Sequence, residues 1–275
     1  MVPKTDYAFP LGIQLTMPDN LRDGEFLATL ELLRDLGFSG LELNITDFEK
    51  YAPGDFVSLL AGYDLEFRYI STGVYANRNG LSLSADDPAV REKTVAELRK
   101  ILRFAAEIGC GAICGFIKGG PGGDRREATE RIIACLSQLE PSLAGAKTPL
   151  LIEATNHYEA PAAWSIPETL AIVSRFDNPW LRVLPDTYHM NIEDGDMFHS
   201  FASAFGRYQS VHVSDNNRYF PGFGGIDFFR VLAGLKGLGY KGVIAIEGKT
   251  RGPLADDIAY SADYLRRVSD RVRML

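Results

Sequence analysis

Eight short apolar runs alternate with longer amphipathic stretches along the chain, and this alternation restricts the possible folds most strongly. Each run has the length and composition of a single buried β-strand. The predicted strands are residues 10–15, 39–44, 65–70, 112–117, 149–154, 181–186, 210–215 and 242–247. Strands that alternate with helices in this way predict a parallel sheet covered by helices.

The stretches between the strands carry apolar residues at i, i+3 and i+4, which is the spacing of one helix face. The clearest predicted helices are residues 25–38, 90–109, 127–145, 226–239 and 256–272. Many end in a similar phrase, as in DLGFSG, EIGCGA and GLGYKG, in which a glycine can close the helix in a left-handed conformation. This repeated turn from helix to strand supports the α/β assignment.

The length of 275 residues is compatible with two average domains or with one closed barrel. No Pro-rich or Ser-rich linker, low-complexity tract or long run of charge interrupts the series. Eight β/α units in this length match a (β/α)8 barrel, the TIM barrel, better than an open sheet with a second domain. We therefore predict an α/β protein with a single (β/α)8-barrel domain over residues 1–275.

The formal net charge of −7 gives no general electrostatic reason to bind nucleic acid or an anionic membrane, because phosphates are bound by clustered Lys and Arg. Residues 1–15 lack a signal-peptide pattern, and no apolar stretch approaches the roughly 20 residues that span a bilayer. We expect a cytoplasmic protein that binds a small molecule. The three cysteines have no paired spacing and are predicted to be buried apolar residues: Cys110, Cys114 and Cys135.

Four successive predicted strands carry an acid or a histidine at or near their C-terminal ends, where the active sites of such barrels lie. These residues are Glu153, Asp186, His212 and Glu247. Any one acid could instead cap the following helix. Together, however, three uncompensated carboxylates at the barrel axis would repel one another and lose solvation. The pattern therefore predicts one bound divalent cation. This ligand set suits Mn²⁺ or Mg²⁺, with Co²⁺ and Zn²⁺ as alternatives.

Four motifs carry a resemblance to a known family: IEATNHYE (152–159), LPDTYHMNIED (184–194), HVSDNNRYFPGFGGIDF (212–228) and IEGK (246–249). They resemble the xylose isomerase-like barrel superfamily, and within it the ketose 3-epimerase group typified by D-tagatose 3-epimerase and D-psicose 3-epimerase. The similarity covers essentially the whole chain and is densest over residues 149–251. It implies that the four residues above hold one cation, usually Mn²⁺, which also binds two adjacent oxygens of the sugar.

The resemblance also implies roles for individual residues. Glu153 and Glu247 would stand on opposite faces of the substrate and exchange the proton on its C3. His189 corresponds to a histidine that hydrogen-bonds the substrate, with a structural histidine near the metal as the alternative. Arg218 corresponds to an arginine that stabilises an enediolate oxygen, with an exposed ion-paired arginine as the alternative. Glu159 corresponds to a glutamate that touches the sugar, or is a solvated loop carboxylate.

These residues predict a metal-dependent ketose 3-epimerase, in which one glutamate removes the C3 proton and the other returns a proton on the opposite face. A hydroxypyruvate-type isomerase and a keto-sugar or cyclitol dehydratase are alternatives on the same metal site. An endonuclease IV-like phosphodiesterase would need a cluster of metals and more than the four histidines present. A non-catalytic sugar-binding barrel would have lost ligands. The resemblance also implies a homodimer or homotetramer.

The glycine-rich segment GFIKGGPGGDRR (115–126) resembles a flexible loop around an anion. Lys118, Arg125 and Arg126 could contact a phosphate there or only water. The segment has no Gly-Lys-Ser/Thr ending and is not a P-loop. Because Arg218 and His189 are expected to face hydroxyl or carbonyl oxygens, we favour an unphosphorylated ketose as the substrate.

Overall fold

Eight parallel strands form one sheet in the computed structural model of the chain, which describes residues 7–275. The strands are β1 (Leu11–Thr16), β2 (Gly40–Asn44), β3 (Glu66–Ser71), β4 (Gly111–Cys114), β5 (Leu150–Glu153), β6 (Leu181–Leu184), β7 (Ser210–Val213) and β8 (Val243–Ile246). Their order in the sheet is β6-β5-β4-β3-β2-β1-β8-β7. Every predicted strand is present, and the predicted TIM barrel is confirmed.

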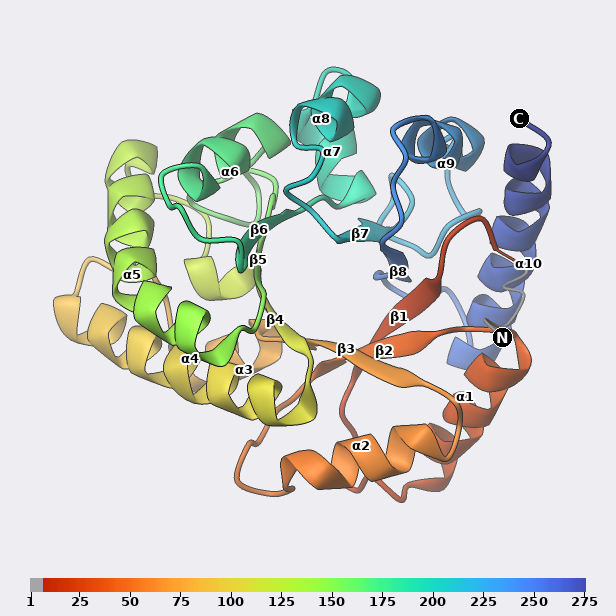
Figure 1. Ribbon diagram of the computed structural model, residues 1–275, viewed down its shortest axis with the longest axis horizontal. Coiled ribbons are helices and arrows are strands. Elements are labelled where there is room, and N and C mark those ends of the chain that lie inside the picture. The colour runs from red at the N-terminus through yellow and green to blue at the C-terminus, as the bar shows by residue number, and fades with distance from the viewer. Residues whose placement is uncertain (1–6) are drawn as a thin grey trace.

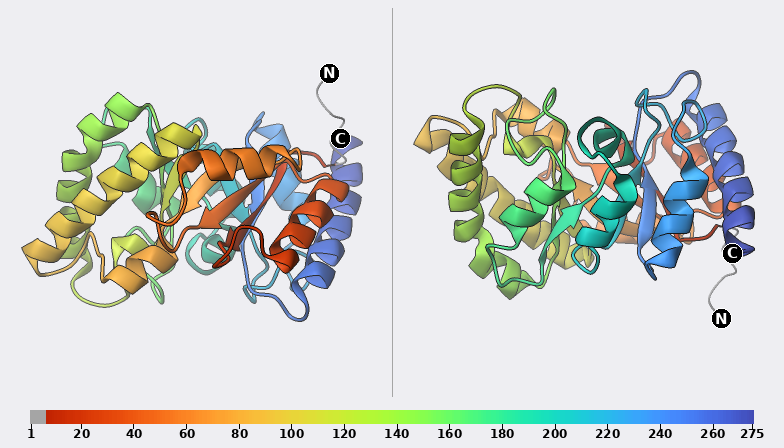
Figure 2. Two further views of the ribbon diagram at one scale, coloured as in Figure 1. Left: turned by 90° about the horizontal axis from the view of Figure 1, so that it is seen from below. Right: turned by 90° about the horizontal axis from the view of Figure 1, so that it is seen from above.

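Helices surround the strands and follow the chain order around the ring (Figure 1), and the two further views of Figure 2 show them outside the strands. They are α1 (Gly24–Asp35), α2 (Pro53–Ala61), α3 (Gly73–Asn79), α4 (Pro88–Ile108), α5 (Arg125–Ala146), α6 (Ile166–Val173), α7 (Thr187–Glu193), α8 (Met197–Ser203), α9 (Phe228–Gly237) and α10 (Leu254–Arg273), with a short 3-10 helix η1 (Phe116–Lys118). The five predicted helices correspond to α1, α4, α5, α9 and α10. The remaining α-helices have at most nine residues, too few for a clear periodic pattern.

The glycines of the repeated helix-to-strand phrase adopt the predicted conformation. Gly37, Gly109 and Gly239 have φ angles of 78°, 83° and 79°. A side chain in this left-handed region would be strained, so glycine is the residue that lets the chain leave the helix and enter the next strand within a short turn.

The ring of strands closes between β6 and β7 through a short seam. Asp186 and His212 form an isolated parallel bridge, and the His212 backbone N donates to Pro185 O over 2.8 Å. Beside this bridge, Thr187 Oγ1 donates to Ser214 O over 2.7 Å and accepts from Ser214 N over 3.0 Å. Two of the predicted cation ligands therefore also close the barrel.

The main hydrophobic core packs the strands against the helices. A second, smaller cluster of buried residues contains Tyr69, Ile113, Leu151 and Leu184. Leu151 and Leu184 precede Glu153 and Asp186 by two positions, and alternate residues of a strand share a face. The small cluster therefore fills the barrel interior beneath the acidic residues and gives them an apolar floor.

The cysteines Cys110, Cys114 and Cys135 are buried and free, as predicted. Within residues 7–275, no helix has both the length and the apolar character needed to cross a membrane. Residues 1–6, part of the segment that lacks a signal-peptide pattern, lie outside the described part of the chain.

Asp215 organises the loop that leads from β7 to α9. Its buried carboxylate accepts hydrogen bonds from the backbone N of Gly222, Gly224 and Ile226 over 3.0, 2.8 and 2.8 Å. A Cβ on Gly224 would overlap this carboxylate, so the close approach requires glycine. The same loop carries Arg218, whose position therefore depends on Asp215.

Replacing Asp215 with Ala should lower the free energy of unfolding by about 3 kcal/mol or more, because several backbone N–H groups lose an ionised acceptor and each such bond contributes about 1.5–3 kcal/mol. Urea denaturation followed by circular dichroism measures this change. Asp256→Ala, which removes an exposed acid from the first turn of α10, is the matched control and should cost less than about 1 kcal/mol. Equal midpoints for the two variants would contradict the role assigned to Asp215.

Candidate active site

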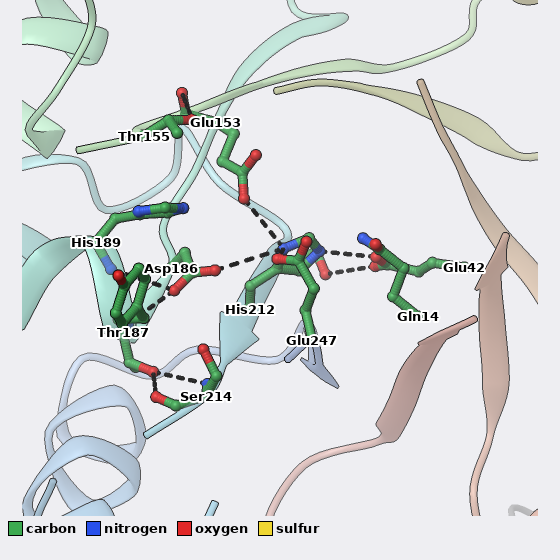
Figure 3. Close-up of polar contacts among 12 residues, drawn as sticks. Gln14, Glu42, Glu153, Thr155, Asp186, Thr187, His189, His212, Ser214 and Glu247 are labelled. Atoms are coloured by element: carbon green, nitrogen blue, oxygen red, sulfur yellow. Dashed lines mark hydrogen bonds and ion pairs between the residues drawn. The ribbon is translucent and has the colours of Figure 1, made fainter. Parts of the chain in front are cut away.

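The four predicted cation ligands converge at the C-terminal end of the barrel. One donor atom from each of Glu153, Asp186, His212 and Glu247 lies within 4.8 Å of all the others. His212 Nδ1 is 2.7 Å from Glu247 Oε2, 3.4 Å from Glu153 Oε1 and 3.9 Å from Asp186 Oδ2 (Figure 3). Side chains that lie up to 94 residues apart in the sequence, from Glu153 to Glu247, are thus assembled around one imidazole nitrogen.

Glu42 of β2 holds the opposite edge of the His212 ring, and the sequence analysis did not single it out. His212 Nε2 lies 2.7 Å from Glu42 Oε2, and both side chains are fully buried (Figure 3). A carboxylate that accepts from Nε2 leaves Nδ1 free to face a metal, and such outer carboxylates commonly orient metal-binding histidines. The available signal was an acid in the middle of the apolar run GLELN.

The charged groups at this centre strongly shift the pKa values of one another. Burial would lower the pKa of His212, but Glu42 and Glu247 outweigh burial and raise that pKa well above its usual value. Burial would raise the pKa of Glu247, but Arg218 and His212 lower it well below the usual value. Arg218 contacts Asp186 Oδ2 over 2.6 Å and Glu247 Oε2 over 3.0 Å, and these carboxylates raise its pKa despite its burial. The centre therefore favours positive charge.

One carboxylate oxygen at the centre has no hydrogen-bond partner within the described chain. This atom, Glu153 Oε1, is buried, and an unpaired buried acceptor is unfavourable. Three carboxylates and one imidazole form an oxygen-rich donor set that suits Mn²⁺ or Mg²⁺. The residues present therefore fit a divalent cation, which would supply the partner that Glu153 Oε1 lacks.

Gly115, directly after β4, gives the Glu153 carboxylate its space. A Cβ at position 115 would overlap Glu153 Oε2. Any larger residue would push the carboxylate away from its present position, so this glycine belongs to the site although it offers no donor atom.

His189 is oriented by Asn156, a second residue that the sequence analysis did not single out. His189 Nδ1 lies 2.7 Å from Asn156 Nδ2 and 3.3 Å from the Asn156 backbone N. Because the backbone N–H can only donate, Nδ1 is the acceptor and the ring proton is on Nε2. Nε2 is buried without a partner in the described residues, and in Figure 3 the ring extends toward the space between Glu153 and Asp186. His189 can therefore donate to a substrate oxygen.

A pocket of about 350 Å³ opens beside the centre. Its lining includes Gln14, Asn44, Phe116, Glu159, Tyr188, Arg218, Glu247 and Lys249. Glu159 accepts from Asn156 Nδ2 over 3.2 Å, and the Arg218 guanidinium lies 4.9 Å from the centre of the Tyr188 ring. The predicted substrate residues Glu159 and Arg218 thus reach the pocket, whereas His189 is fully buried next to it.

The glycine-rich segment 115–126 is a loop only in part: residues 120–124 form an exposed loop and Arg126 is exposed in the first turn of α5, but Lys118 lies on the short helix η1. Lys118 is fully buried, and its Nζ donates to Glu153 O and, over 3.2 Å, to Thr155 Oγ1. It is therefore shielded from solvent, and burial lowers its pKa to about 8. Arg125 begins α5 and pairs with Glu168 over 3.0 Å.

Comparison with known proteins places the fold and site in a family. A family model described as "Xylose isomerase-like TIM barrel" matches residues 30–268. The chain belongs to this family. The predicted resemblance is thereby confirmed at the level of the superfamily.

Among curated relatives, the chain is 32% identical over 176 residues to L-ribulose 3-epimerase of Methylomonas sp. (strain DH-1). The matched segment covers 61% of this chain and 62% of that protein. The chain is 26% identical over 235 residues to ketose 3-epimerase of Arthrobacter globiformis, which covers 84% of this chain and 80% of that protein. A solved L-ribulose 3-epimerase structure has a TM-score of 0.83 at 22% identity and covers 97% of this chain and 96% of its own. These relatives support the ketose 3-epimerase group within the family.

Glu42→Gln should weaken Mn²⁺ binding about 10- to 100-fold, the usual effect of losing an outer carboxylate, because a neutral amide orients His212 less strongly. Isothermal titration calorimetry on metal-free protein measures this affinity. Glu49→Gln, an exposed acid on the loop after β2, is the matched control and should bind Mn²⁺ as the unmodified protein does. If both variants bound Mn²⁺ equally well, Glu42 would have no orienting role.

Gly115→Ala should reduce Mn²⁺ affinity at least about tenfold, because the added methyl group displaces the Glu153 carboxylate. Gly120→Ala is the control, since a Cβ at position 120 meets nothing within 4 Å. The same calorimetric titration compares the two. A Gly115→Ala variant with unchanged affinity would show that Glu153 is free to move without loss of the cation.

Proposed function

We propose that this protein is a metal-dependent ketose 3-epimerase that inverts the configuration at C3 of a ketose. The observation that carries the proposal is the pair of carboxylates on Glu153 and Glu247, which lie 3.4 and 2.7 Å from the same nitrogen of His212. Inversion requires a base on each face of the substrate, whereas aldose–ketose isomerisation can proceed with one. The epimerase relatives support the same reaction class.

In the proposed reaction, one of Glu153 and Glu247 removes the proton from C3. The electron pair of the C3–H bond becomes a C2–C3 double bond, and the carbonyl oxygen at C2 takes up negative charge as an enediolate. The other glutamate, which must carry a proton at this stage, delivers it to the opposite face of C3, and proton exchange with solvent then restores both carboxyl groups. A bound divalent cation, for which we propose Mn²⁺, would polarise the carbonyl and so acidify the C3–H bond.

Two further side chains would bind the reacting part of the sugar. His189 would donate its Nε2 proton to a substrate oxygen, since Nδ1 is occupied by Asn156. Arg218 would stabilise the negative oxygen of the enediolate with its guanidinium group. Glu159, on the pocket wall, would accept from a sugar hydroxyl. Donors placed before the reaction stabilise developing charge without reorganisation.

We propose a free ketose as the substrate rather than a ketose phosphate. The pocket lining offers amide and carboxylate groups from Gln14, Asn44 and Glu159, which suit the hydroxyls of a sugar. Lys118 and Arg125 are not among the residues that line this pocket, so neither would meet a phosphate bound there. We also propose that residues 1–275 act as one catalytic domain in a cytoplasmic homodimer or homotetramer, in keeping with the family resemblance.

Glu153→Gln and Glu247→Gln test the two-base reaction. Each variant keeps a carbonyl oxygen for the cation but cannot accept a proton, so each should lose epimer formation by about 100- to 10,000-fold. The assay follows C3 epimers and the uptake of deuterium from heavy water with a panel of free and phosphorylated ketoses. The two variants should retain deuterium exchange with opposite preferences for the two epimers, because each keeps the base of one face.

Metal analysis of both variants is the control, since a variant without its cation would be inactive for another reason. Near-normal epimerisation by either fully loaded variant would exclude two essential bases. Exchange without any C3 epimer in the unmodified protein would favour a single-base isomerase or a dehydratase.

A further inference from the structure

Lys118 is a fully buried cation that the proposed proton transfers do not use. It lies at the end of η1, and its Nζ donates to the main-chain O of Glu153 and, over 3.2 Å, to Thr155 Oγ1. Both partners are uncharged, and a buried ammonium group without a directly paired carboxylate is unfavourable. Its position therefore needs a source of compensation from nearby charge.

The carboxylates whose charge favours the ammonium form of Lys118 are those of Glu153, which belongs to the buried centre, and of Glu168. The centre contains four carboxylates, which belong to Glu42, Glu153, Asp186 and Glu247. With one divalent cation and a neutral His212, the two side-chain cations Arg218 and Lys118 bring the centre to electrical neutrality.

Arg218 and Lys118 contact different proposed ligands of the cation. The ion pairs of Arg218 in the described structure are with Asp186 and Glu247, over 2.6 and 3.0 Å. Lys118 donates to the main-chain oxygen of Glu153 and not to the Glu153 carboxylate. Glu153 Oε1 consequently stays without a hydrogen-bond partner in the described chain. Lys118 thus brings positive charge to this side without occupying the oxygens that a cation and a substrate proton need.

Lys118 also fixes the point at which β5 ends. Thr155 Oγ1 lies 3.5 Å from Glu153 O, so the ammonium, the hydroxyl and the carbonyl form one buried hydrogen-bonded group. Gly115, on the same β4-to-η1 turn, provides the space for the Glu153 carboxylate. The segment 115–118 therefore contacts both the main chain and the side chain of this residue.

We propose that Lys118 is a positioning residue for the cation site: its ammonium group anchors the end of β5, so that the Glu153 carboxylate is held facing the other cation ligands. The inference rests on the cation-dependent function proposed above, and it holds for whichever ketose is the substrate.

The test uses Lys118→Met, which keeps the length of the side chain and removes its charge and its donors. Metal-free full-length protein is titrated with Co²⁺ by calorimetry and by visible absorption, because Co²⁺ absorption reports the arrangement of its ligands. The variant should bind Co²⁺ about 10- to 100-fold more weakly, with a changed spectrum, because the loss of the anchor at the end of β5 outweighs the removal of a nearby positive charge, which by itself would favour a cation. Its metal-free melting temperature should equal or exceed that of the unmodified protein, since an apolar residue of similar volume often replaces a buried charge without loss of stability.

Two further variants separate position from charge and from folding. Lys241→Met removes an exposed positive charge outside the pocket, and Co²⁺ affinity and spectrum should stay unchanged. Thr155→Val removes one acceptor of Lys118 and should weaken Co²⁺ binding about two- to tenfold, as expected for one hydrogen bond. None of these measurements needs a substrate, so a failure of the proposed epimerase activity would leave their result unaffected.

Unchanged Co²⁺ affinity in Lys118→Met would overturn the proposal. A lower affinity together with a lower melting temperature and an unchanged spectrum would also overturn it, because general loss of packing gives that combination. If Lys118→Met does not fold, Thr155→Val decides, and unchanged Co²⁺ affinity in that variant would reject the positioning role.

Discussion

The concentration of carboxylates around His212 is the constraint on which the rest of the site depends. Buried carboxylates repel one another and lose solvation, so they can share a site only where positive charge lies among them. Here Arg218 and the imidazole of His212 provide part of that charge through direct contacts. The barrel seam closes at the same place through the Asp186–His212 bridge. A bound cation would therefore also join β6 to β7, so binding and ring closure stabilise each other.

The strands and the cation ligands could be predicted because their signals are local. An apolar run defines each strand, and a polar residue at its end stands out from that run, as Glu153 and Glu247 do. Glu42 was missed because it lies inside a strand, and its partner His212 is 170 residues away. Lys118 was misjudged because a glycine-rich segment suggests an exposed loop. Its burial comes from tertiary packing against β5, and no local pattern reports that contact.

The short helices were missed for a related reason. An amphipathic pattern needs several turns before it differs from chance, and α3, α7 and α8 have seven residues each. Aspartate side chains cap the N-termini of α7 and α8, and all three helices pack against neighbouring elements. The Asp186 carboxylate, for example, accepts from the backbone N of Tyr188 and His189 over 2.7 and 3.4 Å. A predicted cation ligand thus starts α7 and places His189 beside the pocket, so one side chain links local structure to the site.

The two proposed bases have different surroundings, and this difference bears on the reaction. Glu247 Oε2 is engaged by His212 Nδ1 over 2.7 Å and by Arg218 Nη2 over 3.0 Å, whereas Glu153 Oε1 has no hydrogen-bond partner in the described chain. Arrival of a cation and a sugar would therefore have to displace two close contacts at Glu247 Oε2, against one longer ion pair of 3.4 Å with His212 Nδ1 at Glu153 Oε1. Glu153 is also the more buried of the two side chains, with 4% of its surface exposed against 15% for Glu247. A carboxylate that must first release charged partners is the weaker base, so removal of the C3 proton on the Glu247 face should require more rearrangement than removal on the Glu153 face.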